Sequence, residues 1–248
     1  MTHDQSGRRN LNDRGALREV ANFLTPGRCV IFDFDGPLCR LFPNESSAPL
    51  AQDLRRIAVE RGAGRLLVGE ASFSIDPLVV LKTVYQNRPG SRLAATLEAR
   101  LARGELAAAA VAPPTRGADL LVRRLVEAGV RVAVATNNSP AAVEAYLRRA
   151  GIDRHFNGHI HGRTDDPTRL KPDPDSIHRA VEGLGVEPYE ALMIGDMPTD
   201  LNAALEAKVA FVGYARNEVE ARPLWTGGAE IVVSQMELLS AMIPLTSS

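Results

Sequence analysis

Two carboxylates spaced one residue apart end the first strongly apolar run of the chain. Asp33 and Asp35 follow Cys-Val-Ile-Phe at 29–32 and precede Gly36. Side chains alternate along an extended strand, so the two carboxylates would point the same way. Neighbouring carboxylates repel unless a cation lies between them, and Mg²⁺ prefers oxygen ligands such as carboxylates and phosphate oxygens. Taken alone, this cluster fits a cation site and a solvated Asp-Gly turn equally well.

A second polar cluster, Thr136-Asn137-Asn138-Ser139, separates another apolar run from a helical pattern that begins at Pro140. A hydroxyl, amides and the free N–H groups of a helix N-terminus can together cradle a phosphate. Capping of the helix by Asn138 or Ser139 explains the same residues, with Pro140 at the first helical position. On its own, the cluster favours the capping explanation.

Two further clusters carry charge. Lys171 lies in Arg-Leu-Lys-Pro-Asp-Pro, where prolines stiffen the chain. It could neutralise a phosphate or a phosphorylated carboxylate, although alone it is more typical of a solvated lysine. Asp196 and Asp200 lie in Gly-Asp-Met-Pro-Thr-Asp, near the start of a helical pattern, where negative charge is favoured. A capping motif also accounts for them, but a Gly-Asp loop that ends an apolar strand is typical of a ligand site.

The elements that position these clusters alternate along the chain. His159 and His161 are predicted to share one face of a short strand. Strand–helix alternation predicts an α/β fold with a doubly wound, Rossmann-like parallel sheet, in which ligands bind at the carboxyl ends of the strands. Apolar runs typical of buried strands occur at 29–32, 130–135, 191–194, 209–212 and 230–233. Apolar residues at helical spacing occur at 143–150, 177–184 and 201–205.

The alternation is interrupted between the first strand and about Pro114. Three helices are predicted there, at 48–60, 76–87 and 91–110, with no clear buried strand. Basic residues outnumber acidic ones in this insertion, which suits an anionic substrate. We therefore divide the chain into a tail and short helix at 1–27, an α/β core at 28–38 and 115–248, and a helical cap at 39–114.

The composition indicates a folded intracellular protein. The 248 residues are 45% hydrophobic and 24% charged, with a net charge of -1, which suits a packed core and gives no basic excess for a nucleic-acid polymer. No apolar run approaches the ~20 residues of a membrane helix, and the polar N-terminal segment lacks the apolar stretch of a signal peptide. We expect a cytoplasmic protein without a membrane partner.

Cys29 and Cys39 are expected to be free thiols, because a strand between them would hold them too far apart to bridge.

Taken together, the four clusters resemble the motifs of the haloacid dehalogenase superfamily. Its members carry Asp-x-Asp-Gly after the first strand, Ser or Thr after the second conserved strand, a Lys, and then Gly-Asp-x-x-x-Asp. Asp33, Thr136, Lys171 and Asp196 stand at these points in the same order. The chain looks most similar to phosphoglycolate phosphatase-like members with a helical cap. This resemblance implies a Mg²⁺-dependent phosphatase that acts on a small phosphorylated metabolite.

The resemblance also implies a phospho-aspartate mechanism. Asp33 would be the nucleophile that forms an aspartyl-phosphate. Asp35 would protonate the leaving alcohol as general acid and then activate water as general base. Mg²⁺ would be held by Asp33, the backbone carbonyl of Asp35, and Asp196.

The remaining site residues would handle the phosphate and the rest of the substrate. Thr136 and the Asn137 amide would bind phosphate oxygens. Lys171, also catalytic, would bridge the nucleophile and the phosphate, and Asp200 would position Lys171 or a metal-bound water. Arg40, just past the first motif, is expected to bind substrate and to contribute to specificity.

Several alternatives bear on this assignment. Pro37 stands where the family usually has Thr, which loosens local hydrogen bonding but removes no catalytic group. Asp35 argues against a dehalogenase, since dehalogenases lack the second Asp. A phosphonatase would need a Schiff-base lysine in the cap, and Lys82, the one cap lysine in the sequence, is expected to reach the surface. A phosphomutase of the β-phosphoglucomutase kind and a non-catalytic protein that binds a phospho-ligand remain open.

Overall fold

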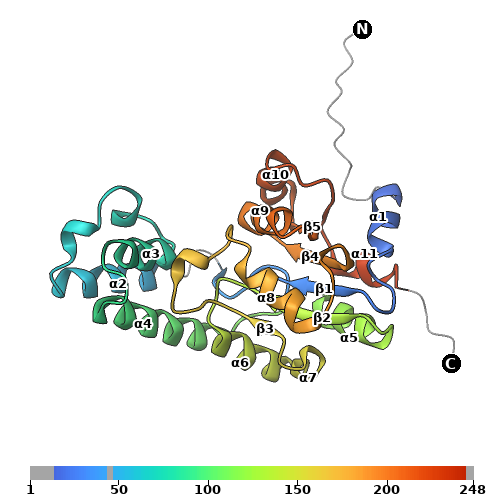
Figure 1. Cartoon of the computed structure of the whole chain (residues 1–248), viewed down its shortest axis with the longest axis horizontal. Helices are drawn as coiled ribbons and strands as arrows, with labels where there is room; N and C mark the ends of the chain where they lie inside the picture. The colour runs from blue at the N-terminus through green and yellow to red at the C-terminus, as the bar shows by residue number, and fades with distance from the viewer. Residues whose placement is uncertain (1–13, 44–46, 244–248) are drawn as a thin grey trace, which may run out of the picture.

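A sheet of six parallel strands forms the centre of the molecule, in the order β3-β2-β1-β4-β5-β6 (Figure 1). The computed structural model describes residues 14–43 and 47–243, so the loose tail predicted at 1–13 lies outside the described residues. The predicted doubly wound α/β sheet is confirmed. The strands are β1 (Cys29–Phe32), β2 (Arg131–Ala135), β3 (Ile160–His161), β4 (Ala191–Gly195), β5 (Ala210–Tyr214) and β6 (Val232–Val233).

The observed strands follow the apolar runs closely in the middle of the sheet and less closely at its edges. β1 occupies the predicted residues, and β2, β4 and β5 begin and end within two residues of their predicted bounds. The run at 230–233 contributes only Val232 and Val233, which pair with β5 alone at the edge of the sheet. β3 lies at the opposite edge and is equally short, because only Ile160 and His161 pair with β2.

Side chains of the central strands alternate between two packed layers. Cys29 and Ile31 pack with helices α8 and α9 on one face, while Val30 and Phe32 pack with α5, α6 and α11 on the other. This burial on both faces explains why the strands are nearly continuous apolar runs. The core helices are α1 (Arg14–Ala21), α5 (Ala118–Glu127), α6 (Pro140–Ala150), α7 (Asp153–Phe156), α8 (Asp175–Leu184), α9 (Pro198–Glu206), α10 (Glu218–Thr226) and α11 (Met236–Ser240).

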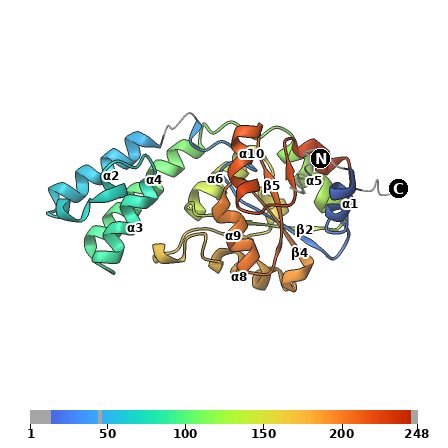
Figure 2. The same ribbon diagram turned by 90° about the horizontal axis from the view of Figure 1, so that it is seen from above.

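The inserted segment between β1 and α5 forms three helices at one end of the molecule (Figures 1 and 2). These are α2 (Ala48–Glu60), α3 (Pro77–Asn87) and α4 (Arg92–Ala109), close to the predicted bounds, with short 3-10 helices at Gly64–Leu66 and Gly69–Ser72. They enclose a hydrophobic cluster of their own, which includes Leu54, Leu81, Val84, Leu97 and Leu101. No helix in the described part of the chain is long and apolar enough to span a membrane.

α4 links the inserted helices to the core. Its first half contributes Leu97 and Leu101 to the cap cluster, whereas Ala109 at its end packs into the main core. Arg149 of α6 donates a hydrogen bond from Nε to the Ala109 carbonyl at 3.2 Å. α4 therefore runs from the cap onto α6, as Figure 2 shows.

The chain leaves and re-enters the core at two adjacent points. The Arg40 N–H donates to the Pro113 carbonyl at 3.0 Å, and the Thr115 N–H donates to the Leu38 carbonyl at 3.1 Å. These hydrogen bonds hold the outgoing and returning segments side by side, so the insertion begins and ends at neighbouring points of the core. A division of the chain at 39 and 114 remains our proposal for the cap boundaries.

Both cysteines are free and buried, as predicted. Burial raises the pKa of the Cys29 thiol to about 12, and burial also raises the pKa of the Cys39 thiol. A thiol with a raised pKa is a poor nucleophile, because the thiolate is the reactive form. Neither cysteine is therefore suited to act as a nucleophile.

Truncation of Ile31 should test the central position of β1. Ile31 is fully buried against the α8 and α9 layer, so Ile31→Ala should lower the free energy of unfolding by about 2–5 kcal/mol. Leu120 on α5 is 46% exposed, and Leu120→Ala should change it by no more than about 0.5 kcal/mol. Urea titration followed by circular dichroism measures both, and equal losses would contradict this placement of β1.

Candidate active site

The site forms where the three central strands end side by side. β1 pairs with β2 and β4, and Phe32 is in register with Val134 and Ile194. Because the strands are parallel, the residues after them emerge at the same edge of the sheet. A cavity of about 840 Å³ lies at this edge, and both core and cap residues line it. The sequence-predicted residues on its wall are Asp33, Asp35, Arg40, Thr136, Asn137, Lys171, Asp196 and Asp200.

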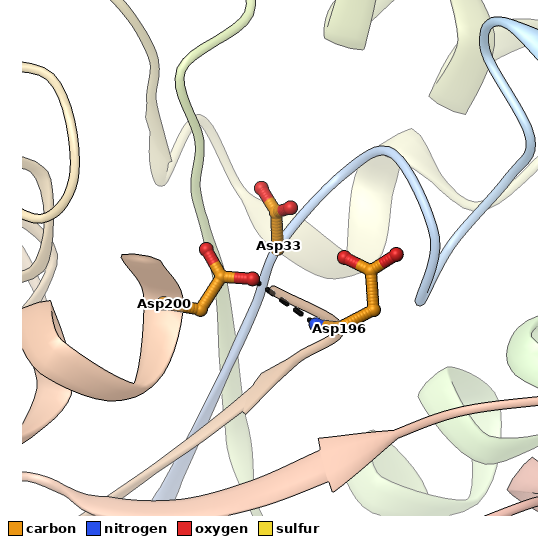
Figure 3. A group of neighbouring side chains, drawn as sticks. All are labelled: Asp33, Asp196 and Asp200. Carbon is orange, nitrogen blue, oxygen red and sulfur yellow. Dashed lines mark hydrogen bonds between the residues drawn. The ribbon is translucent and has the colours of Figure 1, made fainter. Parts of the chain in front are cut away.

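Three carboxyl groups of the cavity wall lie close together (Figure 3). Asp33 follows β1, Asp196 follows β4, and Asp200 lies in the first turn of α9. One carboxylate oxygen from each lies within 4.8 Å of the others. Asp196 Oδ1 is buried and has no hydrogen-bond partner among the described residues. This donor set suits a hard divalent cation, which takes oxygen ligands.

The electrostatics of the cluster point the same way. Burial raises the pKa of Asp33 to about 6, despite the lowering effect of the Lys171 ammonium. Burial, followed by the charges of Asp200 and Asp33, raises the pKa of Asp196 well above its usual value. Carboxylates that resist ionisation in this way are stabilised when a cation binds between them.

Lys171 is the positive charge at the centre of the site. Its Nζ lies 2.8 Å from Asp33 Oδ1 and 2.6 Å from Asp200 Oδ1, and donates to the Ala135 carbonyl at 3.0 Å. Burial acts to lower the pKa of Lys171, but the two carboxylates outweigh it and raise the pKa above its usual value. The buried side chain is therefore a fixed cation between the nucleophile candidate and its neighbour.

Asp200 is fully engaged with the protein. One oxygen pairs with Lys171, and Oδ2 accepts the N–H groups of Asp196 and Met197, both at 3.0 Å. A Cβ on Gly195 would lie within 3.0 Å of three Asp200 side-chain atoms, so glycine permits this close approach. Asp200 thus orients both Lys171 and the loop that carries Asp196.

Gly36 makes room for the carboxyl group of Asp196. Its φ is +105°, in the region that favours glycine, and a Cβ there would lie within 3.0 Å of all three carboxyl atoms of Asp196. The Gly after the Asp-x-Asp pair therefore brings the turn after β1 into direct contact with the loop after β4.

Asp35 is held apart from the acidic cluster. β1 ends at Phe32 and the chain bends at Phe34, so the strict alternation expected of an extended strand does not continue to Asp35. Its Oδ1 accepts the Leu41 N–H at 2.7 Å, and its side chain is not part of the three-carboxylate cluster. Burial raises the pKa of Asp35, because it disfavours the charged form of the carboxyl group.

The loop of residues 136–139, called the phosphate loop after the role that its sequence predicts, caps α6 and lies on the cavity wall. Ser139 caps α6, and its Oγ accepts the Ala142 N–H at 3.3 Å. The Asn137 side chain accepts the Lys171 N–H at 2.8 Å and donates to the Lys171 carbonyl at 3.2 Å. Thr136 is buried on the cavity wall. The loop therefore also fixes the backbone that carries Lys171.

The cap side of the cavity carries two cationic side chains, Arg40 and Lys82. Neither makes an ion pair with a described residue. Arg216, also on the wall, already pairs with Glu220 at 2.8 Å. Lys82 was expected to reach the surface, and it is half-buried on the cavity wall, which Leu78 and Val79 of the same helix also line.

Sequence reasoning missed a buried ion cluster beside the phosphate loop. Arg163, Glu98 and Glu105 form it, and Arg163 and Glu105 are buried. The available signal was weak: two acids seven residues apart lie on one side of the helix predicted at 91–110. Nothing in the sequence pairs them with an arginine 58 residues further along the chain.

Comparison with known proteins assigns the chain to a family. Residues 28–208 match the haloacid dehalogenase-like hydrolase family. The chain is 34% identical over 205 residues to the phosphoglycolate phosphatase of Rhodospirillum rubrum. The aligned region covers 77% of this chain and 83% of that relative. It is 29% identical over 130 residues to a putative pyrophosphatase of Clostridium perfringens, and this alignment covers 52% of this chain and 60% of that relative.

The fold agrees with solved structures as well. CbbY from Rhodobacter sphaeroides, solved with xylulose-(1,5)bisphosphate, matches with a TM-score of 0.63 at 20% identity and covers 88% of this chain and 99% of that chain. The family match extends from the start of β1 past the end of α9 and includes the ends of β1, β2 and β4 at the cavity, whereas Tyr214 at the end of β5 lines the cavity from outside the matched residues. The chain therefore belongs to the haloacid dehalogenase-like hydrolase family.

Proposed function

We propose that this hydrolase is a Mg²⁺-dependent phosphatase that cleaves a small phosphate monoester through an aspartyl-phosphate on Asp33. The observation that carries the proposal is the position of the Asp33 carboxylate on the cavity wall, 2.8 Å from the Lys171 ammonium and within 4.8 Å of a carboxylate oxygen of Asp196 and of Asp200. The R. rubrum relative, named as a phosphoglycolate phosphatase, supports the same class of reaction. A cytoplasmic location stays a prediction of the sequence.

In this proposal the chain itself binds and orients the phosphate. Thr136 and the backbone N–H of Asn137 bind its oxygens, since the Asn137 side chain is committed to the Lys171 backbone. Lys171 lies 2.8 Å from Asp33 and neutralises charge on the nucleophile and on the incoming phosphate. The Asp33 oxygen then attacks phosphorus and displaces the alcohol oxygen, which leaves an acyl phosphate on Asp33.

The metal fit rests on the acidic cluster and on the unpartnered Asp196 Oδ1. Asp33, the backbone carbonyl of Asp35, and Asp196 would hold Mg²⁺. The bound ion would offset the repulsion between the carboxylate nucleophile and the phosphate. Asp200 would stay a supporting residue, because both of its oxygens already have partners.

Asp35 would supply and remove the protons. Its carboxyl group accepts the Leu41 N–H, away from the acidic cluster, and burial raises its pKa, which favours the protonated form that the leaving alcohol requires. Once ionised, the same group would take a proton from the water that attacks the aspartyl-phosphate. The raised pKa therefore serves the first step, and the ionised form left by that step serves the second.

The cavity wall favours a substrate with a second anionic group. Arg40 and Lys82 line the cap side, and no described residue pairs with either one. Phosphoglycolate, named for the R. rubrum relative, carries a carboxylate, and the xylulose bisphosphate in the CbbY structure carries a second phosphate. A phosphomutase with the same core and a non-catalytic phospho-ligand-binding protein are the competing functions.

Phosphatase assays on the purified full chain test the proposal. With p-nitrophenyl phosphate and a panel of phosphorylated metabolites, turnover should need Mg²⁺ and should disappear with a chelator. Asp33→Asn should lower kcat by at least about 10⁴-fold, while its melting temperature stays close to that of the wild type because Asp200 still pairs with Lys171. Absence of turnover on the whole panel favours the binding protein, and net isomerisation of a sugar phosphate favours the mutase.

Asp35→Asn should separate the two chemical steps. The p-nitrophenolate leaving group needs little protonation, whereas hydrolysis of the aspartyl-phosphate still needs a general base. Stopped-flow measurement should show a burst of about one p-nitrophenol per enzyme, and then a steady-state rate lowered by about 10²–10⁴-fold. A steady-state rate equal to that of the wild type would remove Asp35 from the mechanism.

Lys82→Met should separate substrates by charge. KM for phosphoglycolate or another substrate with a second anion should rise by about tenfold, the effect of losing one charge-assisted hydrogen bond. KM for p-nitrophenyl phosphate should stay unchanged, and Lys82→Arg should restore most of the affinity. If KM rises equally for both kinds of substrate, Lys82 does not read a second anion.

A further inference from the structure

The buried ion cluster of Glu98, Glu105 and Arg163, hereafter the Arg163 cluster, joins the cap to the core. Glu98 and Glu105 lie on α4, and Arg163 follows β3. The side chain of Arg163 is 0% exposed, that of Glu105 1% and that of Glu98 26%. A buried arginine of this kind needs a partner for each of its N–H groups.

Every N–H donor of the Arg163 guanidinium has such a partner. Nε and Nη2 donate to the two oxygens of Glu98 at 2.8 and 2.9 Å. Nη1 and Nη2 donate to the two oxygens of Glu105 at 2.9 and 3.0 Å. The remaining Nη1 proton goes to the Asn137 carbonyl at 2.7 Å. The five donors of an arginine are thus all used, and one of them holds the phosphate loop.

Glu105 also forms hydrogen bonds with the phosphate loop. Its Oε1 accepts from Asn138 Nδ2 at 3.1 Å, and its Oε2 accepts the Ser139 N–H at 3.0 Å. The Arg163 N–H donates to the Asn138 carbonyl at 2.9 Å. Three consecutive residues of the phosphate loop are therefore fixed by two side chains, one of which comes from the cap. Within the described part of the chain, Glu98 bonds to Arg163 but makes no hydrogen bond with the phosphate loop, so it serves as the comparison for Glu105.

The charge of the Arg163 cluster decides whether the cluster would aid phosphate binding by electrostatic attraction or by orienting the phosphate loop. One guanidinium and two carboxylates sum to a net negative charge, which by itself opposes an incoming phosphate. The cluster therefore cannot favour phosphate by attraction. Any favourable contribution must come from the way in which it orients the loop, whose preorganised N–H groups would otherwise have to be ordered on binding.

We propose that Glu105 and Arg163 are positioning residues of the phosphate site, and that α4 of the cap is thereby a structural part of phosphate binding. The proposal rests on the phosphatase function proposed above. The connection continues inward, since Asn137, held by Arg163, in turn holds Lys171, and Lys171 contacts Asp33.

Glu105→Gln and Glu98→Gln form a matched pair of tests. Each removes one negative charge from the same arginine, but only Glu105 contacts the phosphate loop. The affinity for inorganic phosphate, measured by isothermal titration calorimetry with Mg²⁺ present, should fall by about tenfold or more in Glu105→Gln. It should stay within about threefold of the wild type in Glu98→Gln. KM should rise with the phosphate Kd, and kcat should fall less.

The outcomes are distinct. Tighter phosphate binding by Glu105→Gln would mean that charge, not orientation, governs the loop, and would overturn the proposal. So would an equal loss in both variants, or a loss of melting temperature with unchanged phosphate Kd. A wild-type protein that neither turns over any substrate of the panel nor binds phosphate would overturn the phosphatase function and this inference together, whereas wild-type turnover and binding with an unaltered Glu105→Gln variant would overturn the inference alone.

A milder variant covers the case in which Glu105→Gln does not fold. Asn138→Ala removes one contact between Glu105 and the loop, together with the hydrogen bond that Thr136 donates to Asn138 Oδ1, and leaves all five donors of Arg163 in place. Its phosphate Kd should rise in the same direction, by about threefold or more. An unchanged Kd in a folded Asn138→Ala protein would contradict the positioning role.

Discussion

The ammonium of Lys171, buried between Asp33 and Asp200, holds the site together. Three carboxyl groups with oxygens within 4.8 Å of one another would repel strongly in a medium of low dielectric. Lys171 offsets part of this repulsion, and its own position depends on the Ala135 carbonyl and on the Asn137 side chain. The ends of β1, β2 and β4 thus all contribute to one electrostatic balance, so the site requires the register of the central strands.

The balance is incomplete in the protein alone. After Lys171 is paired, the pKa values of Asp33 and Asp196 both stay raised. The chain nevertheless keeps these groups in contact, and it uses two glycines, Gly36 and Gly195, to allow the close approach. Backbone shape therefore enforces a concentration of negative charge that the side chains do not neutralise, which is the condition under which a divalent cation contributes most.

Local patterns predicted the parts of the molecule that local physics controls. The apolar run at 29–32 became β1, and the polar groups after the central strands line a common cavity because parallel strands end at one edge. Features that depend on long-range packing were not predictable in this way. The side of α3 that carries Lys82 faces the cavity only because of how the cap sits on the core, and the bend at Phe34 redirects Asp35 toward Leu41.

The adjacent exit and entry points of the insertion have a consequence for how this architecture diversifies. Since the segments around Leu38 and Thr115 are hydrogen-bonded to each other, a helical module of another size could replace the present one without altering the sheet. The Arg163 cluster restricts that freedom. A substitute module would have to present two carboxylates where Glu98 and Glu105 now stand, or it would leave a buried guanidinium without partners. Exchange of the inserted helices is therefore coupled to retention of their contact with Arg163 in the core.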